Sequence, residues 1–391
     1  MRIFTLCFLL FSTLWLSPAF AKELAPSTVK RVLAAQQLVE TGDVAHAIET
    51  LNDLNTKADY DTAYVKRYLA ILNYQAGNSD QAIMLLRDAV TLNALPTQDQ
   101  WQSQRMLADL LLNGQEYQQA LEIYRSILTT DLDAQKTKDI HYRIIQCFYK
   151  LQQWQSALSQ IHSFASLGYT KSVNVLTIQL VSELQLERFK PALSTTDTLL
   201  RIQPTKKNWW MQKVSLQIKL NQLKSALSTL QLAELNKIGL VEQERRLLVQ
   251  LYMNNQLPER AARELAKLQD RTDVEEKRLA QLWQQAKVWD KAEAVWSEIS
   301  KTDKRYAFQL AQVQAMQGKF ESVIASLDRL PEANFDEDAA SLKIQALYKL
   351  DKIEQASKTA HEFIAEENSK KISDWLTYLN QIQQYRAALS S

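Results

Sequence analysis

The residues of this chain that could do catalytic chemistry are four histidines, Cys147 and scattered carboxylates. His361-Glu362 matches the start of a helical zinc-protease motif, but no second histidine follows one turn later. Cys147 and His141 are six residues apart, which places them on different faces of a helix and does not make a thiol–imidazole pair. The acidic clusters Glu366-Glu367 and Asp336-Glu337-Asp338 are typical of solvated loops rather than of acid–base pairs. We therefore expect no enzyme, no metal site and no cofactor.

A different set of side chains is suited to binding another protein. Glutamine amides can bridge the N–H and C=O groups of a peptide, and tyrosine and arginine are frequent anchors of protein interfaces. The candidate partner-binding residues are Tyr64, Arg67, Tyr74, Arg105, Asp109, Tyr142, Gln146, Tyr149, Arg246 and Gln250. The alternative interpretation is that these side chains only form the solvent side of helices.

An internal repeat sets the spacing of these candidates. A small or turn-forming residue is followed, five positions later, by an alanine or valine that we call the anchor, as in Gly42 and Ala47 or Gly77 and Ala82. The ten anchors are Ala47, Ala82, Ala120, Ala157, Ala192, Ala226, Ala261, Ala292, Val323 and Ala356. Consecutive anchors are 31 to 38 residues apart, and a sustained period of this length is typical of repeat proteins.

Each repeat is predicted to be a pair of helices. Apolar residues recur four and seven positions after an anchor, as in Ala120, Tyr124 and Ile127, which is the pattern of one helix face. A small or aliphatic residue also lies twelve positions before each anchor, such as Ala70. A small anchor lets two antiparallel helices approach closely. We expect helix pairs over residues 30–368 and one final amphipathic helix over residues 369–391 that covers the last apolar face.

The small residue of the first helix, the aromatic residue three positions before the anchor (Tyr117, Trp154) and the anchor itself resemble the tetratricopeptide repeat. The family's tryptophan near the start of the first helix is mostly absent here, and its glycine is replaced by alanine or an aliphatic residue. The resemblance implies an all-α fold, an α-solenoid that forms a right-handed superhelix of about ten helix pairs with a C-terminal capping helix. It also implies that the first helices line a concave surface, on which the candidate residues would hold a protein segment.

Composition supports a helical fold. Only 6 glycines and 7 prolines are present, too few to form the turns of a sheet-rich protein or a glycine-rich phosphate loop. The 46 basic and 44 acidic residues nearly balance, which gives no electrostatic reason to expect nucleic-acid binding. The lone Cys147, next to Ile144, Ile145 and Phe148, is predicted to be a buried thiol. In Trp209-Trp210, one ring is expected to face the core.

The N-terminal segment differs from the rest of the chain. Residues 3–16 form an apolar run that is broken only by threonine and serine, and Ala19-Phe20-Ala21 provides small residues for cleavage. Residues 1–21 are therefore predicted to be a secretory signal peptide, cleaved after Ala21, followed by an exposed lead-in over residues 22–29. The alternative is an uncleaved membrane anchor, for which this run is short. No transmembrane segment is expected in the mature chain.

The N-terminal third is similar to a narrower group of proteins. Residues 60–69 (YDTAYVKRYL), Gly77-Asn78, residues 104–111 (QRMLADLL), Tyr117 and Ala120-Leu121 resemble exported tetratricopeptide proteins that are assigned to TonB systems. This resemblance implies a Gram-negative periplasm and a protein partner such as TonB or the ExbB–ExbD complex, which energise the uptake of iron chelates or haem across the outer membrane. The second hypothesis is a periplasmic adaptor for cell-envelope assembly or polysaccharide export, and the third is an enzyme with a hidden site. Nothing in the sequence indicates the oligomeric state.

Overall fold

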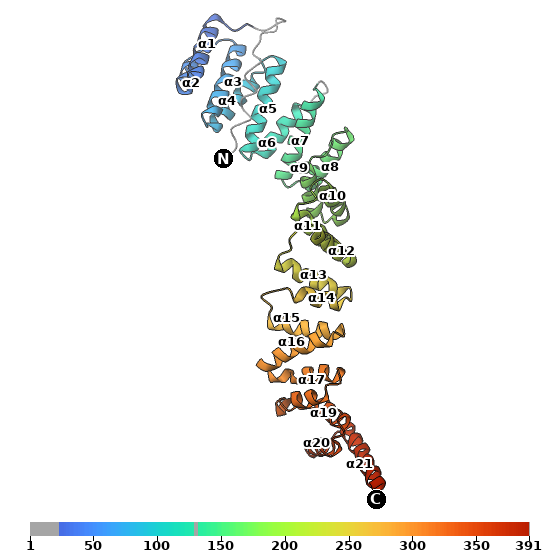
Figure 1. Cartoon of the computed structure of the whole chain (residues 1–391). Helices are drawn as coiled ribbons and strands as arrows, with labels where there is room; N and C mark the ends of the chain where they lie inside the picture. Colours follow the sequence, from blue (N-terminus) through green and yellow to red (C-terminus); the bar gives the residue numbers. More distant parts are fainter. Residues whose placement is uncertain (1–22, 129–131, 391) are drawn as a thin grey trace. The chain divides into compact units, whose positions relative to one another are not determined.

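A computed structural model describes residues 23–128 and 132–390 (Figure 1), and the predicted signal peptide lies outside these residues. The described residues form twenty-one α-helices and two 3₁₀ turns, with no strand. Within each of two compact units, successive helices pack against one another in chain order, as antiparallel pairs that each stack on the next pair of the same unit. The predicted all-α solenoid of about ten helix pairs with a final helix is confirmed.

The chain divides into two compact units, and the boundary along the sequence falls between Ile202 and Gln203. The N-terminal unit contains five helix pairs: α1 (Pro26–Glu40) with α2 (Val44–Asn52), α3 (Asp59–Gln75) with α4 (Ser79–Thr91), α5 (Thr97–Asn113) with α6 (Tyr117–Ser126), α7 (Ala134–Lys150) with α8 (Trp154–Ser166), and α9 (Val173–Gln185) with α10 (Phe189–Ile202).

The C-terminal unit contains five more pairs and the final helix. The pairs are α11 (Lys207–Lys219) with α12 (Leu223–Leu235), α13 (Glu242–Asn254) with α14 (Pro258–Leu265), α15 (Asp273–Gln285) with α16 (Trp289–Thr302), α17 (Ala307–Met316) with α18 (Phe320–Leu327), and α19 (Glu337–Lys349) with α20 (Ile353–Glu366). The 3₁₀ turns η1 (Lys304–Tyr306) and η2 (Glu332–Asn334) precede α17 and α19. Helix α21 (Lys370–Ser390) packs on both α19 and α20.

A tight turn connects the first and second helix of every pair. The turn after α3 shows how: Gly77 N donates to Tyr74 O (3.0 Å) and Asn78 N donates to Asn73 O (2.8 Å), which is a Schellman motif. In each of the ten turns, the residue five positions before the anchor has a left-handed backbone, with φ between 54° and 85°. These residues are Gly42, Gly77, Gln115, Gln152, Glu187, Asn221, Gln256, Lys287, Gly318 and Asp351. The turn ends the first helix and reverses the chain, so that the anchor meets that helix again.

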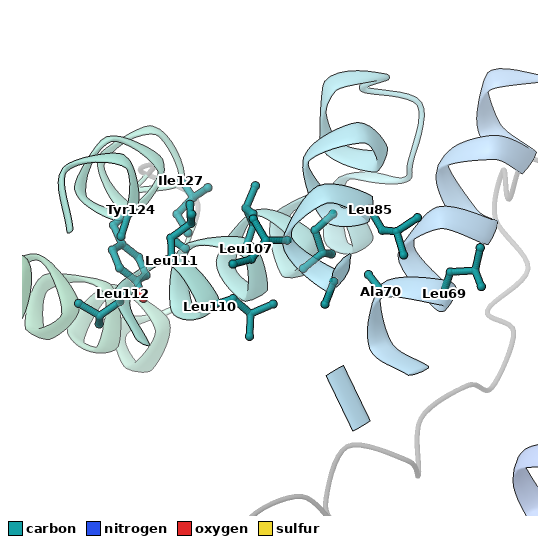
Figure 2. Close-up of a cluster of buried hydrophobic side chains, with 14 of the residues drawn as sticks. Leu69, Ala70, Leu85, Leu107, Leu110, Leu111, Leu112, Tyr124 and Ile127 are labelled. Carbon is teal, nitrogen blue, oxygen red and sulfur yellow. The ribbon is translucent and has the colours of Figure 1, made fainter. Parts of the chain in front are cut away.

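The anchors form the core of each pair. All ten have no exposed surface, and the residues twelve positions before them are at most 6% exposed. Figure 2 shows part of the N-terminal core, in which Ala70 of α3, Leu107 of α5 and Tyr124 of α6 belong to one cluster that continues from repeat to repeat. Since each pair buries its apolar surface against the next pair of the same unit, burial alone can hold each unit together. Cys147 is fully buried, as expected.

The lead-in predicted over residues 22–29 is exposed at five of its seven described positions, 23–29, but part of it is already helical. Helix α1 already begins at Pro26, and Thr28 is 2% exposed. The reason is the buried carboxylate of Asp61 on α3, whose Oδ2 accepts hydrogen bonds from Ala25 N (3.1 Å) and from Thr28 Oγ1 (2.5 Å). This carboxylate holds the first turn of α1 against α3.

The Trp209-Trp210 pair also differs from the prediction, because neither ring is buried. The Trp209 Nε1 donates to Gln203 Oε1 (3.0 Å), and the Trp210 Nε1 donates to Pro204 O (2.8 Å). An indole N–H that leaves water needs an acceptor, and the loop before α11 provides one for each ring. Both half-buried rings therefore cover this loop.

Candidate functional site

The first helices of consecutive repeats in the N-terminal unit are joined by arginine side chains. Arg67 on α3 reaches α5, where its Nη1 lies 3.2 Å from Asp99 Oδ1 and its Nη2 donates to Gln102 Oε1 (2.8 Å). Arg105 on α5 reaches α7, with its Nη2 2.5 Å from Asp139 Oδ2. We call the surface that α3, α5 and α7 share the first-helix face. Its arginines form a ladder that runs from each first helix to the next.

Asp109 is the centre of this ladder. Its Oδ1 lies 3.4 Å from the Nε of Arg143 on α7, and its Oδ2 lies 3.8 Å from the Nε of Arg105. Its Oδ1 also accepts a hydrogen bond from the hydroxyl of Tyr124, which is completely buried on α6. Burial and the neighbouring Asp109 carboxylate raise the pKa of Tyr124 well above its usual range, so the hydroxyl remains a donor. Asp109 thus ties together three helices, and its role is at least partly structural.

The aromatic and amide candidates on this surface are half-buried. Tyr64 packs edge-on against Tyr60, with 6.3 Å between ring centroids, and burial raises the pKa of Tyr64. Gln146 Nε2 donates to the hydroxyl of Tyr142 (3.2 Å), and Gln146 Oε1 accepts from Arg143 Nη1 (3.4 Å). These side chains are ordered by one another but still reach solvent.

Two other candidates do not belong to the ladder. Tyr149 packs edge-on against Trp154 at the start of α8, with 5.8 Å between ring centroids, so it stabilises its own helix pair. Tyr74 is 42% exposed at the C-terminal end of α3. The structure therefore brings Arg105 and Asp109 into one network with Tyr142 and Gln146 through Arg143. Arg67 forms a separate rung with Asp99 and Gln102, while Tyr149 and Tyr74 lie nearer to the helix ends.

The two candidates in the C-terminal unit repeat part of this arrangement. Arg246 on α13 reaches α15, where its Nε lies 2.7 Å from Glu275 Oε1. Its Nη1 lies 3.2 Å from Glu242 Oε2, and hydrogen bonding to the Arg246 guanidinium lowers the pKa of Glu275. Gln250 is exposed, and its Nε2 donates to Asn254 Oδ1 one turn away (3.0 Å). Arg246 thus joins two consecutive first helices, as Arg67 and Arg105 do. The hydrogen bond described for Gln250 lies within its own helix.

Sequence reasoning missed the partners of these arginines. Arg67, Arg105 and Arg246 all lie fifteen positions before an anchor, and each faces a carboxylate about one repeat further along the chain. These ion pairs could have been predicted from one pattern in the sequence. A basic residue recurs at a constant repeat position, and an acidic residue follows it roughly one repeat later.

Trp101 on α5 is a second residue that was missed. Its ring lies beneath two cations, with 5.7 Å from its centroid to Arg105 Cζ and 5.3 Å to Lys136 Nζ. Its Nε1 donates to Ile127 O (3.3 Å). A cation held over an indole face is stabilised by the ring quadrupole, so Trp101 helps to orient Arg105 at the first-helix face.

The side chains that could do catalysis are dispersed. Residues 23–128 and 132–390 contain no group of three or more histidine, cysteine or acidic side chains that could hold a metal ion. Burial raises the pKa of the Cys147 thiol to about 12, and burial lowers the pKa of His141, whose Nδ1 lies beside the Gln160 amide. Asp336 caps α19 by accepting from Ala339 N (3.0 Å), so this acidic cluster starts a helix rather than forming the predicted loop.

None of the helices in the described ranges combines the length and the apolar character that a membrane span requires. No family model matches the sequence, and no curated protein is matched either. Among solved structures, the chain is similar to a tetratricopeptide repeat protein from Parabacteroides merdae (15% identity, 66% of this chain and 99% of that chain, TM-score 0.38).

It is also similar to the C-terminal part of a TPR repeat-containing protein from Cytophaga hutchinsonii (15% identity, 70% of this chain and 95% of that chain, TM-score 0.39). A third similar structure is YrrB, described as a TPR protein with an unusual peptide-binding site (14% identity, 43% of this chain and 83% of that chain, TM-score 0.35).

Proposed function

We propose that this protein is a non-enzymatic scaffold of the tetratricopeptide type that binds a protein partner through its first helices. The observation that carries the proposal is the arginine ladder of the first-helix face, where Arg67 and Arg105 are ordered yet remain partly exposed. An arginine that is held in place loses less side-chain entropy on binding than a free one, which favours its use as an anchor. A carboxylate or a backbone carbonyl of a partner could bond to the guanidinium N–H groups that stay solvated.

We further propose that the scaffold works in a Gram-negative periplasm, as an accessory component of a TonB-dependent uptake system. This part rests on the resemblance of residues 60–121 to exported proteins of that group and on the predicted signal peptide. The proposed partner is TonB or the ExbB–ExbD complex, and the transported compound would be an iron chelate or haem.

The test is binding of the full chain to purified TonB and to the purified ExbB–ExbD complex, measured for the wild type and for the triple variant Tyr64→Ala, Arg67→Ala, Arg105→Ala. We expect the triple variant to lose at least about tenfold in affinity, since interface tyrosine and arginine residues often contribute more than 1 kcal/mol each. The control is Arg87→Ala, which removes an exposed arginine of a second helix that bonds to Gln119 (2.9 Å).

Two results would count against the proposal. If neither TonB nor ExbB–ExbD binds the wild-type chain, the TonB assignment is wrong. If a partner binds and the triple variant binds it equally well, while circular dichroism shows that the variant is folded, the first-helix face of the N-terminal unit is not the binding surface.

A further inference from the structure

A hollow of about 670 Å³ lies between α19 and the final helix α21. The rings of Trp375 and Tyr378 on α21 line it. The charged side chains that also line it are Glu337, Lys370, Lys371 and Asp374. Helix α21 packs on α19 and α20 near the C-terminus (Figure 1). The volume is within the range of pockets that bind ligands, about 300–1,000 Å³.

Three aromatic rings support one another beside this hollow. Tyr348 of α19 packs on Trp375 and on Tyr378, with 6.0 and 5.7 Å between ring centroids. Trp375 and Tyr378 lie 6.1 Å apart, and the ring planes of the three pairs make angles of 53° to 68°. Tyr378 remains 44% exposed. The rings therefore form an aromatic surface that is held in place before a ligand binds and is still open to solvent.

The polar groups of these rings are donors that the chain does not fully use. The hydroxyls of Tyr348 and Tyr378 lie 3.1 Å apart, so one donates to the other, and the accepting hydroxyl keeps its own proton for a further bond. Within residues 23–128 and 132–390, no acceptor is found for the indole N–H of the half-buried Trp375. A ligand that covers these rings must therefore bring hydrogen-bond acceptors.

The charges around the hollow favour an uncharged ligand. Two carboxylates, Glu337 and Asp374, line it together with two ammonium groups. One of the latter, the Nζ of Lys371, lies 2.8 Å from Asp338 Oδ1. Because both signs of charge are present, a strongly acidic or strongly basic segment would meet repulsion as well as attraction.

Two glutamines continue the surface of the hollow along the first helices. Gln312 on α17, Gln345 on α19 and Tyr378 on α21 follow one another at a constant spacing of 33 residues. These three first helices contact one another in order, and packed helices lie about 8–10 Å apart. Gln345 is exposed and Gln312 is half-buried. Three residues of a polyproline II helix span about 9 Å, so one turn of such a chain matches one repeat.

We propose that the hollow between α19 and α21 binds a proline-rich segment of the partner protein in the polyproline II conformation. The inference rests on the proposed function and deepens it, because it adds a second binding surface and names the chemistry of the segment held there. A proline ring would pack on Trp375 and Tyr378, and the chain would continue past Gln345. The polyproline II backbone has no internal hydrogen bonds, so its carbonyls can accept from the free N–H and O–H groups. Proline itself brings neither a charge nor an N–H.

The test is binding of two fluorescein-labelled peptides to the full chain, measured by fluorescence anisotropy. One peptide consists of four Pro-Pro-Ala triplets and the other consists of six Gly-Ser pairs. We expect only the proline peptide to bind. Its affinity should change less than about twofold between about 50 and about 500 mM NaCl, since binding forms no ion pair that salt could screen.

Three substitutions should weaken binding of the proline peptide. Tyr378→Ala removes a ring from the hollow and should cost at least about fivefold in affinity. Trp375→Phe keeps a ring but removes the N–H donor, and Gln345→Ala removes an amide next to the hollow; each should cost about two- to fivefold. Because Trp375→Phe retains most of the packing, it decides the question if circular dichroism shows that Tyr378→Ala does not fold.

The matched control is Tyr385→Ala. Tyr385 is a tyrosine of the same helix and is 67% exposed, but it does not line the hollow. The inference is overturned if the proline peptide does not bind, if the Gly-Ser peptide binds equally well, or if salt weakens binding by about tenfold. It is also overturned if Tyr378→Ala and Tyr385→Ala have equal effects, or if sedimentation shows a dimer that Tyr378→Ala dissociates, because a second copy would then occupy the hollow. An unchanged affinity of Gln345→Ala would overturn the placement of the segment along the glutamines.

The failure of this inference can be told apart from the failure of the proposed function. If TonB or ExbB–ExbD binds Tyr378→Ala as tightly as it binds the wild type, the scaffold function stands and the hollow is not a place of capture. If the wild-type chain binds neither of these partners but does bind the proline peptide at the hollow, the hollow is a binding site and the TonB assignment fails.

Discussion

The guanidinium of Arg105 lies 2.5 Å from the carboxylate of Asp139, on the first helix of the next repeat. Both side chains are about one-third exposed, at 35% and 29%. Apolar burial holds neighbouring helix pairs together but does not by itself fix the angle between them. Because Arg105 and Asp139 belong to neighbouring repeats, their ion pair adds a contact that depends on this angle. The ladder of such links gives the first-helix face a defined geometry.

The energy of this link can be measured with a double-mutant cycle of Arg105→Met and Asp139→Asn. We expect a coupling free energy of about 0.5–1 kcal/mol in low salt, since the pair is partly exposed. The coupling should fall in 1 M NaCl, where charges are screened over about 3 Å. A coupling that is zero at low salt would show that the ladder does not stabilise the stack. The measurement is the unfolding free energy of the first transition in urea, because a chain with two units need not unfold in one step.

The turns of the helix pairs predict a second effect on stability. Lys287 adopts φ = 58°, a conformation that costs a residue with a side chain about 1 kcal/mol relative to glycine. Lys287→Gly should therefore raise the melting temperature slightly. The reverse change, Gly77→Ala, should lower it, and the cause is the backbone alone, because an added Cβ at Gly77 would meet no atom within 4 Å.

Differential scanning calorimetry of the two variants checks this prediction, with a change of about 0.5–1 kcal/mol in opposite directions. Ser79→Ala, close to Gly77 but already helical, is a control for which we expect little change. If Lys287→Gly destabilises the chain by as much as Gly77→Ala does, glycine's greater freedom in the unfolded state outweighs the strain of the turn.

The helix pairs could be predicted from the sequence because the signals that form them are local and recur. Ala157 is an anchor that is followed by Ile161 and Phe164 on one helix face, and a turn residue, Gln152, lies five positions earlier. All three apolar residues are buried in the structure. Gln152 and the other non-glycine turn residues do not predict a turn by their residue type alone. Their constant distance from an anchor does predict one.

The network of the site could not be predicted in the same way. Which acid Arg105 meets depends on how two helices from different repeats are aligned, and a long flexible side chain can reach several positions. Seven of the ten repeats have no arginine fifteen positions before the anchor, among them those with Tyr142, Met211 and Phe308 at this place. The repeat position alone therefore does not predict where an arginine bridges two helices.

The packing of the anchors gives a third prediction. Ala157 has no exposed surface, so Ala157→Leu must push α7 and α8 apart or force a strained rotamer. We expect a loss of about 1–3 kcal/mol in unfolding free energy, measured by thermal and urea unfolding. Ser159→Leu on the same helix is exposed and should change stability by less than about 0.5 kcal/mol. Equal stability of the two variants would mean that Ala157 is not a close-contact position.

The buried thiol of Cys147 predicts how stability depends on pH. Burial raises the pKa of this thiol from its ordinary value of 9.0 to about 12 in the folded chain. Above pH 9 the thiol ionises in the unfolded chain while the folded chain keeps its proton, so ionisation favours unfolding and the free energy of unfolding falls as the pH rises. Ionisation of the thiol therefore leaves the free energy of unfolding unchanged below pH 9 and lowers it between pH 9 and about 12. Above that range both states have lost the proton, and the thiol causes no further change.

Urea unfolding at a series of pH values from 7 to 11 tests this for the wild type and Cys147→Ala. The variant should be less stable at pH 7, because a buried side chain is shortened, but its stability should fall less steeply above pH 9. Tyr124 adds a second alkaline loss above its ordinary pKa of 10.0, since its pKa is also raised in the folded chain. The double variant Cys147→Ala, Tyr124→Phe should therefore show the shallowest slope of all. Identical slopes in the wild type and Cys147→Ala would mean that the thiol ionises equally in both states, and would contradict the raised pKa of the buried thiol.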